Sequence, residues 1–444
     1  MTVPTYPEAR QAALESLERG DAREAFRKFR GTMEYPGQLG DDPERWRDAV
    51  TVFARIAAAL ADDALATLVR RAADAPDDIQ ALYDLGCELI EQNLNGIAAT
   101  VLARANLLLP NQELFVTDLA CALERDLRFG EACRFLRAAP ELVEESFVCR
   151  YALAYNTLMT GDLIEARRML RGLDPGDDHD LTAMTDRIAG MLSRADAVQG
   201  VTRLNETDLR GWHFVLTGGV LLHLWPLELD AMRGRYAYTT DDPSRCLEGI
   251  RRLASVFEAW SVRPTRVWLL PNPDSASLGS AAAQVLGLPS ERWPPRGTTE
   301  PGLIVAYDLS TLDETLVGQV REHRRDQFLW AHASCWTTEP PFAADLTTYL
   351  YQYNASPWGE RVGMNPDTRQ FERLPADTRP PADRATEIVA ANLDAEALKD
   401  VPALVDLAQA ARRVTGGTGL GAFRTEGLRR RQPVGSPVWS NRFY

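Results

Sequence analysis

Two short polar segments in the second half of the chain hold the side chains best suited to chemistry. PNPDSAS (271–277) follows the apolar run RVWLL, and DLSTLDET (308–315) continues from the apolar run GLIVAY. Carboxylates and hydroxyls beside the start of a helix are suited to bind a phosphorylated or hydroxyl-bearing ligand, because a helix N-terminus presents free N–H groups. The candidate ligand-binding residues are Asp274, Ser275, Asp308, Thr311 and Thr315.

A purely structural role explains the same residues. Asp274 and Ser275 follow a proline, a position from which helices often begin. In the second segment, Ser310 or Thr311 would cap a helix whose first turn carries acids facing the positive end of the helix dipole. The sequence leaves both interpretations open.

Other catalytic patterns are missing from the sequence. The chain has no CxxC pair, no HxH or HExxH motif and no GxSxG motif, so a triad of Ser275, His332 and Asp308 would lack its usual nucleophile turn. Neither lysine, Lys28 or Lys399, lies in a phosphate-binding GxxxxGK[ST] loop. We therefore predict no metal site and no cofactor, and we assign no catalytic residue.

Strands and helices are expected to alternate after residue 200. Apolar runs typical of buried strands alternate with amphipathic or small-residue helices, and this order favours a parallel sheet over about 205–345. Ligands bind such sheets at the carboxyl ends of the strands, where both polar segments lie. The expected strands are 212–224 (or a hairpin), 266–270, 302–308 and 327–335, and the expected helices are 244–260, 276–288 and 313–325.

The two polar segments resemble parts of the type I phosphoribosyltransferases. A strand that ends in a Pro/Asp loop, followed by an Ala-rich helix ending in Leu-Gly-Leu-Pro, is similar to that family's pyrophosphate loop. The run IVAYDLSTLDETL resembles its phosphoribosyl-pyrophosphate loop. The resemblance implies that Asp308 contacts ribose hydroxyls, that Thr311 and Thr315 lie at the phosphate, and that Mg²⁺ accompanies a phosphorylated ligand.

Three departures from that family's pattern imply that the transfer activity is lost. Tyr307 replaces the first acid of the loop, Leu312 replaces a threonine, and Asp313 takes the place of a glycine. Two like charges about 4 Å apart repel by about 4 kcal/mol at an effective dielectric near 20, so Asp313 would oppose a bound phosphate.

The first two-fifths of the chain repeats with a period of 34 residues. A small residue followed by a leucine one helical turn later is typical of paired helices that pack closely against the next pair. The repeat-packing residues are Ala64, Ala98, Ala132 and Ala166, with Leu68, Leu102, Leu136 and Leu170.

The segment from Ile79 to Pro110 resembles the tetratricopeptide repeat in its small-residue and proline positions. The resemblance implies a helical solenoid over 1–200, ended by a capping helix at 178–200. In that family the concave face binds an extended peptide or a partner helix. Alternatively, this face packs against the chain's own C-terminal half.

Composition limits the partners and the location. The net charge of −14 opposes binding to nucleic acid or to an anionic membrane surface. No stretch approaches ~20 uninterrupted apolar residues, and the N-terminus has no apolar run of a signal peptide, so we expect a cytoplasmic protein. Lys28 and Lys399 are the only lysines among 49 basic residues, a high-arginine composition of bacterial type.

The sequence therefore predicts a multidomain protein with a tetratricopeptide-like solenoid at 1–200, a phosphoribosyltransferase-like α/β domain at 205–345, and a C-terminal extension at 346–444. That extension carries helices and a basic aromatic tail, which we expect to dock within the chain. The predicted function is a protein-interaction scaffold whose α/β domain is inactive. The alternative is an enzyme or sensor that binds a nucleotide or sugar-phosphate between 271–277 and 308–315.

Overall fold

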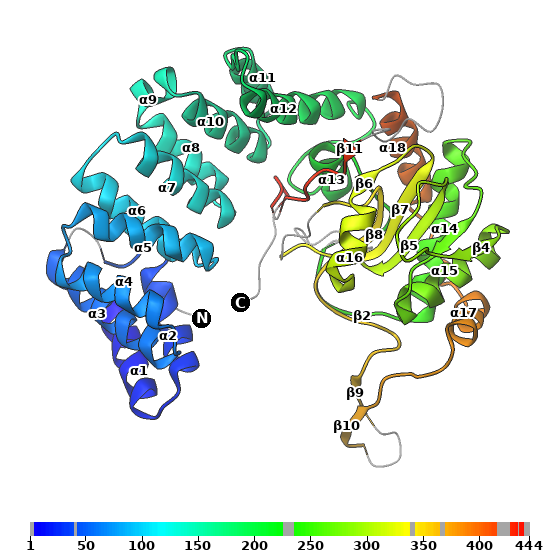
Figure 1. Ribbon diagram of the computed structural model, residues 1–444, viewed down its shortest axis with the longest axis horizontal. Helices are drawn as coiled ribbons and strands as arrows, with labels where there is room; N and C mark the ends of the chain where they lie inside the picture. Colours follow the sequence, from blue (N-terminus) through cyan, green and yellow to red (C-terminus); the bar gives the residue numbers. More distant parts are fainter. Residues whose placement is uncertain are drawn as a thin grey trace. The chain divides into compact units, whose positions relative to one another are not determined.

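The chain divides into two compact units, which we describe separately. Unit 1 comprises Met1–Ile188 and unit 2 comprises Ala189–Tyr444, so the division falls earlier than the expected one near residue 200. The computed structural model describes residues 4–39, 42–224, 235–337, 342–364, 369–414, 427–433 and 435–438 (Figure 1). No helix in these ranges is long and apolar enough to cross a bilayer.

Unit 1 is built from helix pairs, as the 34-residue repeat predicted (Figure 1). A short helix, α9 (Pro140–Glu145), precedes the last pair. Helix α12 (His179–Ala197), within which the division between the two units falls, follows that pair where a capping helix was expected. The pairs are α1 (Tyr6–Glu18) with α2 (Ala22–Met33), α3 (Pro43–Ala59) with α4 (Asp63–Asp74), α5 (Ile79–Glu91) with α6 (Asn95–Leu108), α7 (Glu113–Arg125) with α8 (Phe129–Arg137), and α10 (Phe147–Met159) with α11 (Leu163–Leu170).

Each pair is closed by the same turn. One residue in left-handed conformation ends the first helix, and the N–H of the next residue donates to a carbonyl five positions earlier, as in Leu94 to Leu89 at 2.8 Å. This is the Schellman arrangement, which favours glycine at the left-handed position. The left-handed residues are Gly20, Ala61, Asn93, Leu127 and Gly161.

The turn sets which alanine packs in the second helix. The second helix of each pair completely buries the alanine that lies four residues after its N-cap. These alanines are Ala25, Ala66, Ala98, Ala132 and Ala166. Ala64 is exposed and Leu68 is half-buried, because the turn before α4 lies two residues off the 34-residue period. Leu102 and Leu136 are buried, and Leu170 is half-buried.

Unit 2 contains a parallel sheet with the order β1-β8-β7-β5-β3-β4, in which β2 also pairs with β8. Two antiparallel pairs, β9–β10 and β6–β11, lie outside it. The strands are β1 (Val220–Leu221), β2 (Arg235–Thr240), β3 (Val267–Leu269), β4 (Ser290–Arg292), β5 (Gly302–Asp308), β6 (Glu322–His323), β7 (Gln327–Cys335), β8 (Leu346–Ala355), β9 (Arg361–Met364), β10 (Phe371–Leu374) and β11 (Gly427–Leu428).

The helices of unit 2 connect these strands and follow them (Figure 1). A 3-10 turn, η1 (Leu309–Thr311), comes directly after β5. The helices are α13 (Leu209–Thr217), α14 (Pro243–Ala259), α15 (Pro273–Leu286), α16 (Glu314–Val320), α17 (Pro381–Ala390) and α18 (Val401–Arg413).

Three sequence predictions need correction in unit 2. Residues 212–217 are helical, because Asp208 caps α13 at its start and Gly218, in left-handed conformation, ends it. The helix expected over 313–325 ends at Val320, because the next residues pair with the tail strand β11. Residue 346 is not a domain boundary, since β8 lies between β1 and β7 in the sheet.

The basic tail docks on unit 2. Arg429 is buried, forms an ion pair with Asp345 at 2.8 Å and donates to the carbonyl of Glu322 at 2.9 Å. Trp439, Phe443 and Tyr444 lie outside the described residues, as does the glycine-rich string 415–423.

The turn geometry of unit 1 predicts opposite outcomes for one substitution at two glycines. A Cβ at Gly20 or Gly31 meets no atom within 4 Å, but Gly20 has φ +76° and Gly31 lies inside α2. Gly20→Ala should lower the free energy of unfolding by about 1 kcal/mol because a left-handed residue with a Cβ is strained. Gly31→Ala should raise it by about 0.5–1 kcal/mol through helix propensity.

Chemical denaturation followed by circular dichroism measures both changes on the full chain. Changes of equal sign at the two positions would contradict the role of the turn.

Candidate functional site

The two predicted segments meet at the carboxyl edge of the sheet. Strand β4 follows β3 in the chain and pairs on one side of it, whereas the next strand, β5, pairs on the other side of β3. The neighbouring strands β3 and β5 therefore form a topological switch point, which is the usual ligand position in such sheets. Asn272 caps α15 by accepting the N–H of Ser275 at 2.9 Å, and the Ser275 hydroxyl accepts the N–H of Tyr307 at 2.9 Å. The two segments are therefore hydrogen-bonded to each other.

Side chains from the segment after β8 cover this edge. Trp358 is buried edge-on against Tyr307, with ring centroids 5.4 Å apart, and the Arg384 guanidinium lies 5.6 Å from the Trp358 ring. Asp274 accepts the Ser356 hydroxyl at 2.7 Å and pairs with Arg384 at 3.2 Å. The candidate ligand-binding carboxylate is thus already engaged by the protein.

Asp308 is also engaged. Its carboxylate accepts the N–H of Ser310 at 2.9 Å and the hydroxyl of Tyr351 at 2.7 Å, and the side chain is buried. Burial raises the pKa of Asp308 above its usual range, although both hydrogen bonds act in the opposite direction. Asp308 therefore fixes the end of β5 to β8 and to η1.

The two threonines do not join this cluster. Thr311 and Thr315 are exposed, and the Thr311 hydroxyl donates to the carbonyl of Asp308 at 3.0 Å. Asp313, rather than Ser310 or Thr311, caps the following helix, because its carboxylate accepts the N–H of Leu316 at 2.8 Å. Of the five candidates, the structure brings Asp274, Ser275 and Asp308 to the same edge.

A second polar cluster lies near the same edge, and the sequence analysis missed it. One carboxylate oxygen of Asp241, Oδ2, lies 2.9 Å from the Tyr307 hydroxyl, 3.1 Å from His332 Nε2 and 3.6 Å from Cys246 Sγ. All four side chains are at most 2% exposed. No sequence motif marks this cluster, because its members lie on different elements. Asp241 directly follows β2, Cys246 lies in α14, Tyr307 in β5 and His332 in β7.

The electrostatics of this cluster argue against a nucleophilic thiol. Burial alone would raise the pKa of Asp241, but the neighbouring His332 and the Tyr307 hydroxyl hold it below its usual range. Burial and the Asp241 charge raise the pKa of the Cys246 thiol well above its usual range. The arrangement can hold a buried charge or a metal ion, because it offers one oxygen, one sulfur and one nitrogen ligand atom.

Gly249 allows α14 to approach this cluster closely. A Cβ at Gly249 would lie 2.8 Å from His332 Nδ1 and 3.0 Å from the Thr348 hydroxyl. Any larger residue would push α14 away from β7 and β8, so this glycine is required by packing.

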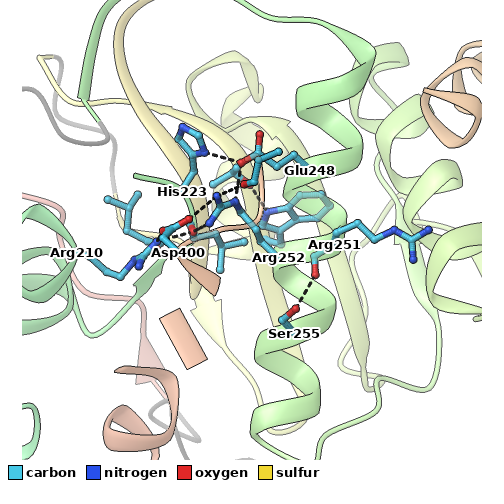
Figure 2. A network of polar contacts seen from close by, with 12 residues as sticks. Arg210, His223, Glu248, Arg251, Arg252, Ser255 and Asp400 are labelled. Carbon is cyan, nitrogen blue, oxygen red and sulfur yellow. Dashed lines mark hydrogen bonds and ion pairs between the residues drawn. The ribbon is translucent and has the colours of Figure 1, made fainter. Parts of the chain in front are cut away.

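Farther along α14, a network of largely buried ions joins the helix to other segments of unit 2 (Figure 2). Arg252 bonds to Glu248 at 2.7 Å, to Asp400 at 2.7 Å and to the carbonyl of Leu222 at 3.0 Å. Arg210 bonds to the other Asp400 oxygen at 2.6 Å. The network therefore connects α13, the end of β1 and the start of α18 to α14.

His223 completes this network. Its Nδ1 lies 2.7 Å from the Glu248 carboxylate. Burial alone would raise the pKa of Glu248, but His223 and Arg252 hold it below its usual range. Burial lowers the pKa of His223. Because every charge here is paired with another side chain of the chain itself, the network is suited to support rather than to catalysis.

Comparison with known proteins identifies no family. No family model and no curated protein matches the chain. It is similar to a solved MamA mutant at 20% identity, covering 37% of this chain and 95% of that chain, with a TM-score of 0.23. MamA structures labelled MSR-1 and AMB-1 match at 21% and 19% identity over 40% and 38% of this chain and 95% and 98% of theirs, both with a TM-score of 0.24. These scores are too low to assign a fold or a function.

The ion network predicts a sharp contrast between two adjacent arginines. Arg252→Met should lower the free energy of unfolding by about 3–5 kcal/mol, because the buried Glu248 and the partly exposed Asp400 each lose a partner. Arg251 is exposed and points away from the network (Figure 2). Arg251→Met should therefore change the free energy of unfolding by less than about 0.5 kcal/mol. Urea denaturation compares the two variants, and equal losses would show that the network contributes little.

Because the carboxylates at the sheet edge are already engaged, we also predict that phosphoribosyl ligands do not bind there. Phosphoribosyl pyrophosphate or nucleotides with magnesium should leave the melting temperature unchanged, because Asp274 and Asp308 already have partners. Thermal-shift measurement on the full chain tests this. A shift that Asp308→Ala abolishes would instead favour the nucleotide- or sugar-phosphate-binding alternative.

Proposed function

We propose that the chain is a cytoplasmic interaction scaffold in which unit 1 binds a segment of a partner protein. The observation that carries the proposal is a row of side chains on the first helices of three successive pairs. Members of this row occur at 34-residue intervals and stay half-buried, while the neighbouring positions of the same helices pack into the core. The row comprises Tyr83, Asp84 and Cys87 of α5, Thr117, Asp118 and Cys121 of α7, and Tyr151 and Ala152 of α10.

Contacts between neighbouring helices hold this row in place. The Tyr83 hydroxyl donates to Asp118 at 2.8 Å, and the Tyr83 ring lies 5.5 Å from the Phe115 ring. The amide of Asn156 donates to Glu124 at 3.1 Å. A prearranged surface loses little entropy when a partner binds, which supports its use for recognition.

The charge of the row favours a cationic partner segment. Helix α5 carries three acids and no basic residue, and α7 adds Asp118 beside them. Asp84 forms an ion pair with Arg71 at 2.8 Å, whereas Asp118 accepts the hydroxyl of Tyr83 at 2.8 Å. Lysine or arginine side chains would complement this surface and speed association.

Unit 2 serves in this proposal as a phosphoribosyltransferase-like domain without transfer activity. The engagement of Asp308 by Tyr351 and of Asp274 by Arg384 supports this part, because a ligand would have to displace both. We also propose that this row of side chains lies on the concave face of unit 1.

Charge neutralisation tests the binding surface. Asp84→Asn with Asp118→Asn keeps a hydrogen-bond acceptor at each position and removes two charges from the row. Recovery of one defined protein partner by the full chain should fall by about tenfold or more, equivalent to about 1.4 kcal/mol.

The matched control is Asp74→Asn with Glu144→Gln, two exposed acids of α4 and α9 outside the row. This variant changes the net charge equally and should retain the partner. Failure of the unaltered chain to recover any partner, or equal losses in both variants, would contradict the proposal.

A further inference from the structure

We propose that Asp241, Cys246 and His332 form a zinc site inside unit 2. Their ligand atoms all lie within 4.8 Å of one another. Asp241 Oδ2 is 3.1 Å from His332 Nε2 and 3.6 Å from Cys246 Sγ. A tetrahedral zinc ion with its usual bond lengths separates an oxygen from a nitrogen ligand by about 3.3 Å and from a sulfur ligand by about 3.6 Å. Both separations from Asp241 Oδ2 thus match the edges of a zinc tetrahedron, and the third separation, between Nε2 and Sγ, is within 4.8 Å.

The hydrogen bonding of Asp241 points to a cation independently of these distances. Three groups converge on Oδ2, while Oδ1 of the same fully buried carboxylate has no hydrogen-bond partner. Ordinary hydrogen bonding would distribute donors over both oxygens, because a buried oxygen without a partner is costly. A cation between Oδ2, Sγ and Nε2 removes this competition, because the thiol proton is released and the imidazole binds the metal through a lone pair.

The donor set selects the metal. Magnesium and calcium prefer oxygen ligands alone, whereas a thiolate and an imidazole favour zinc. The hydroxyl of Tyr307 is the fourth polar group at the site, 2.9 Å from Asp241 Oδ2. This hydroxyl donates to the carboxylate and helps to fix its orientation.

The position of the site gives it a structural role. Asp241 follows β2, Cys246 lies in the first turns of α14, and His332 belongs to β7, so zinc would join an edge strand, a helix and a central strand. All three residues are at most 1% exposed, so we expect zinc to enter during folding and to leave slowly.

Metal content of the full chain tests this site. Protein purified without chelator from zinc-supplemented cells should contain about one zinc per chain by mass spectrometry of the metal. Cys246→Ser and His332→Gln should each reduce zinc to background. The control is Cys133→Ser, which alters a buried cysteine of unit 1 and should retain the zinc.

Cobalt replacement keeps the proposal testable if a variant folds poorly. Refolding the unaltered chain with Co²⁺ should give the visible bands of a tetrahedral site and a near-ultraviolet thiolate-to-cobalt band. Unaltered protein that holds no zinc and gives no such bands would overturn the proposal, as would zinc retained by both site variants. These readouts do not involve partner binding by unit 1, so this proposal and the proposed function can fail separately.

Discussion

Unit 2 depends on the pairing of ionised side chains that its own packing removes from water. Arg252 and Glu248 lie on α14, one helical turn apart, and neither is compatible with an apolar interior alone. Their partners, Asp400 and His223, come from segments far away in the sequence, so α14 is correctly placed only when those segments have docked. A broken buried pair costs about 3–5 kcal/mol, comparable with the whole stability of many domains.

The same constraint explains why the tail belongs to the fold. Asp345 precedes β8 and is almost completely buried, where an isolated carboxylate would be strongly destabilised. Arg429 supplies the compensating charge, and with His323 it holds the pKa of Asp345 far below its usual range despite burial. Residues more than 80 positions later in the chain are therefore needed for the sheet, which makes an independent C-terminal extension physically unfavourable.

Sequence patterns predicted well what local interactions decide. The helix pairs of unit 1 follow from a short period, and the meeting of segments 271–277 and 308–315 follows from strand alternation. Ala64 was misplaced because a two-residue shift of one turn moves the packing position to Ala66. The cluster of Asp241, Cys246 and His332 had no local signal, since 91 residues separate its first and last members and only the sheet order brings them together.

The carboxyl edge illustrates why a loop motif does not by itself decide function. In a parallel sheet the switch point provides a position for a ligand, and Asp274 and Asp308 occupy it as the strand pattern predicts. Whether those carboxylates can bind a ligand depends on their remaining hydrogen-bonding capacity. Here Tyr351 of β8 and Arg384 of α17, both later in the chain, use that capacity. The chemical state of the edge is therefore set by segments outside the motif, and a loop of identical sequence on a sheet without them would be open to ligand.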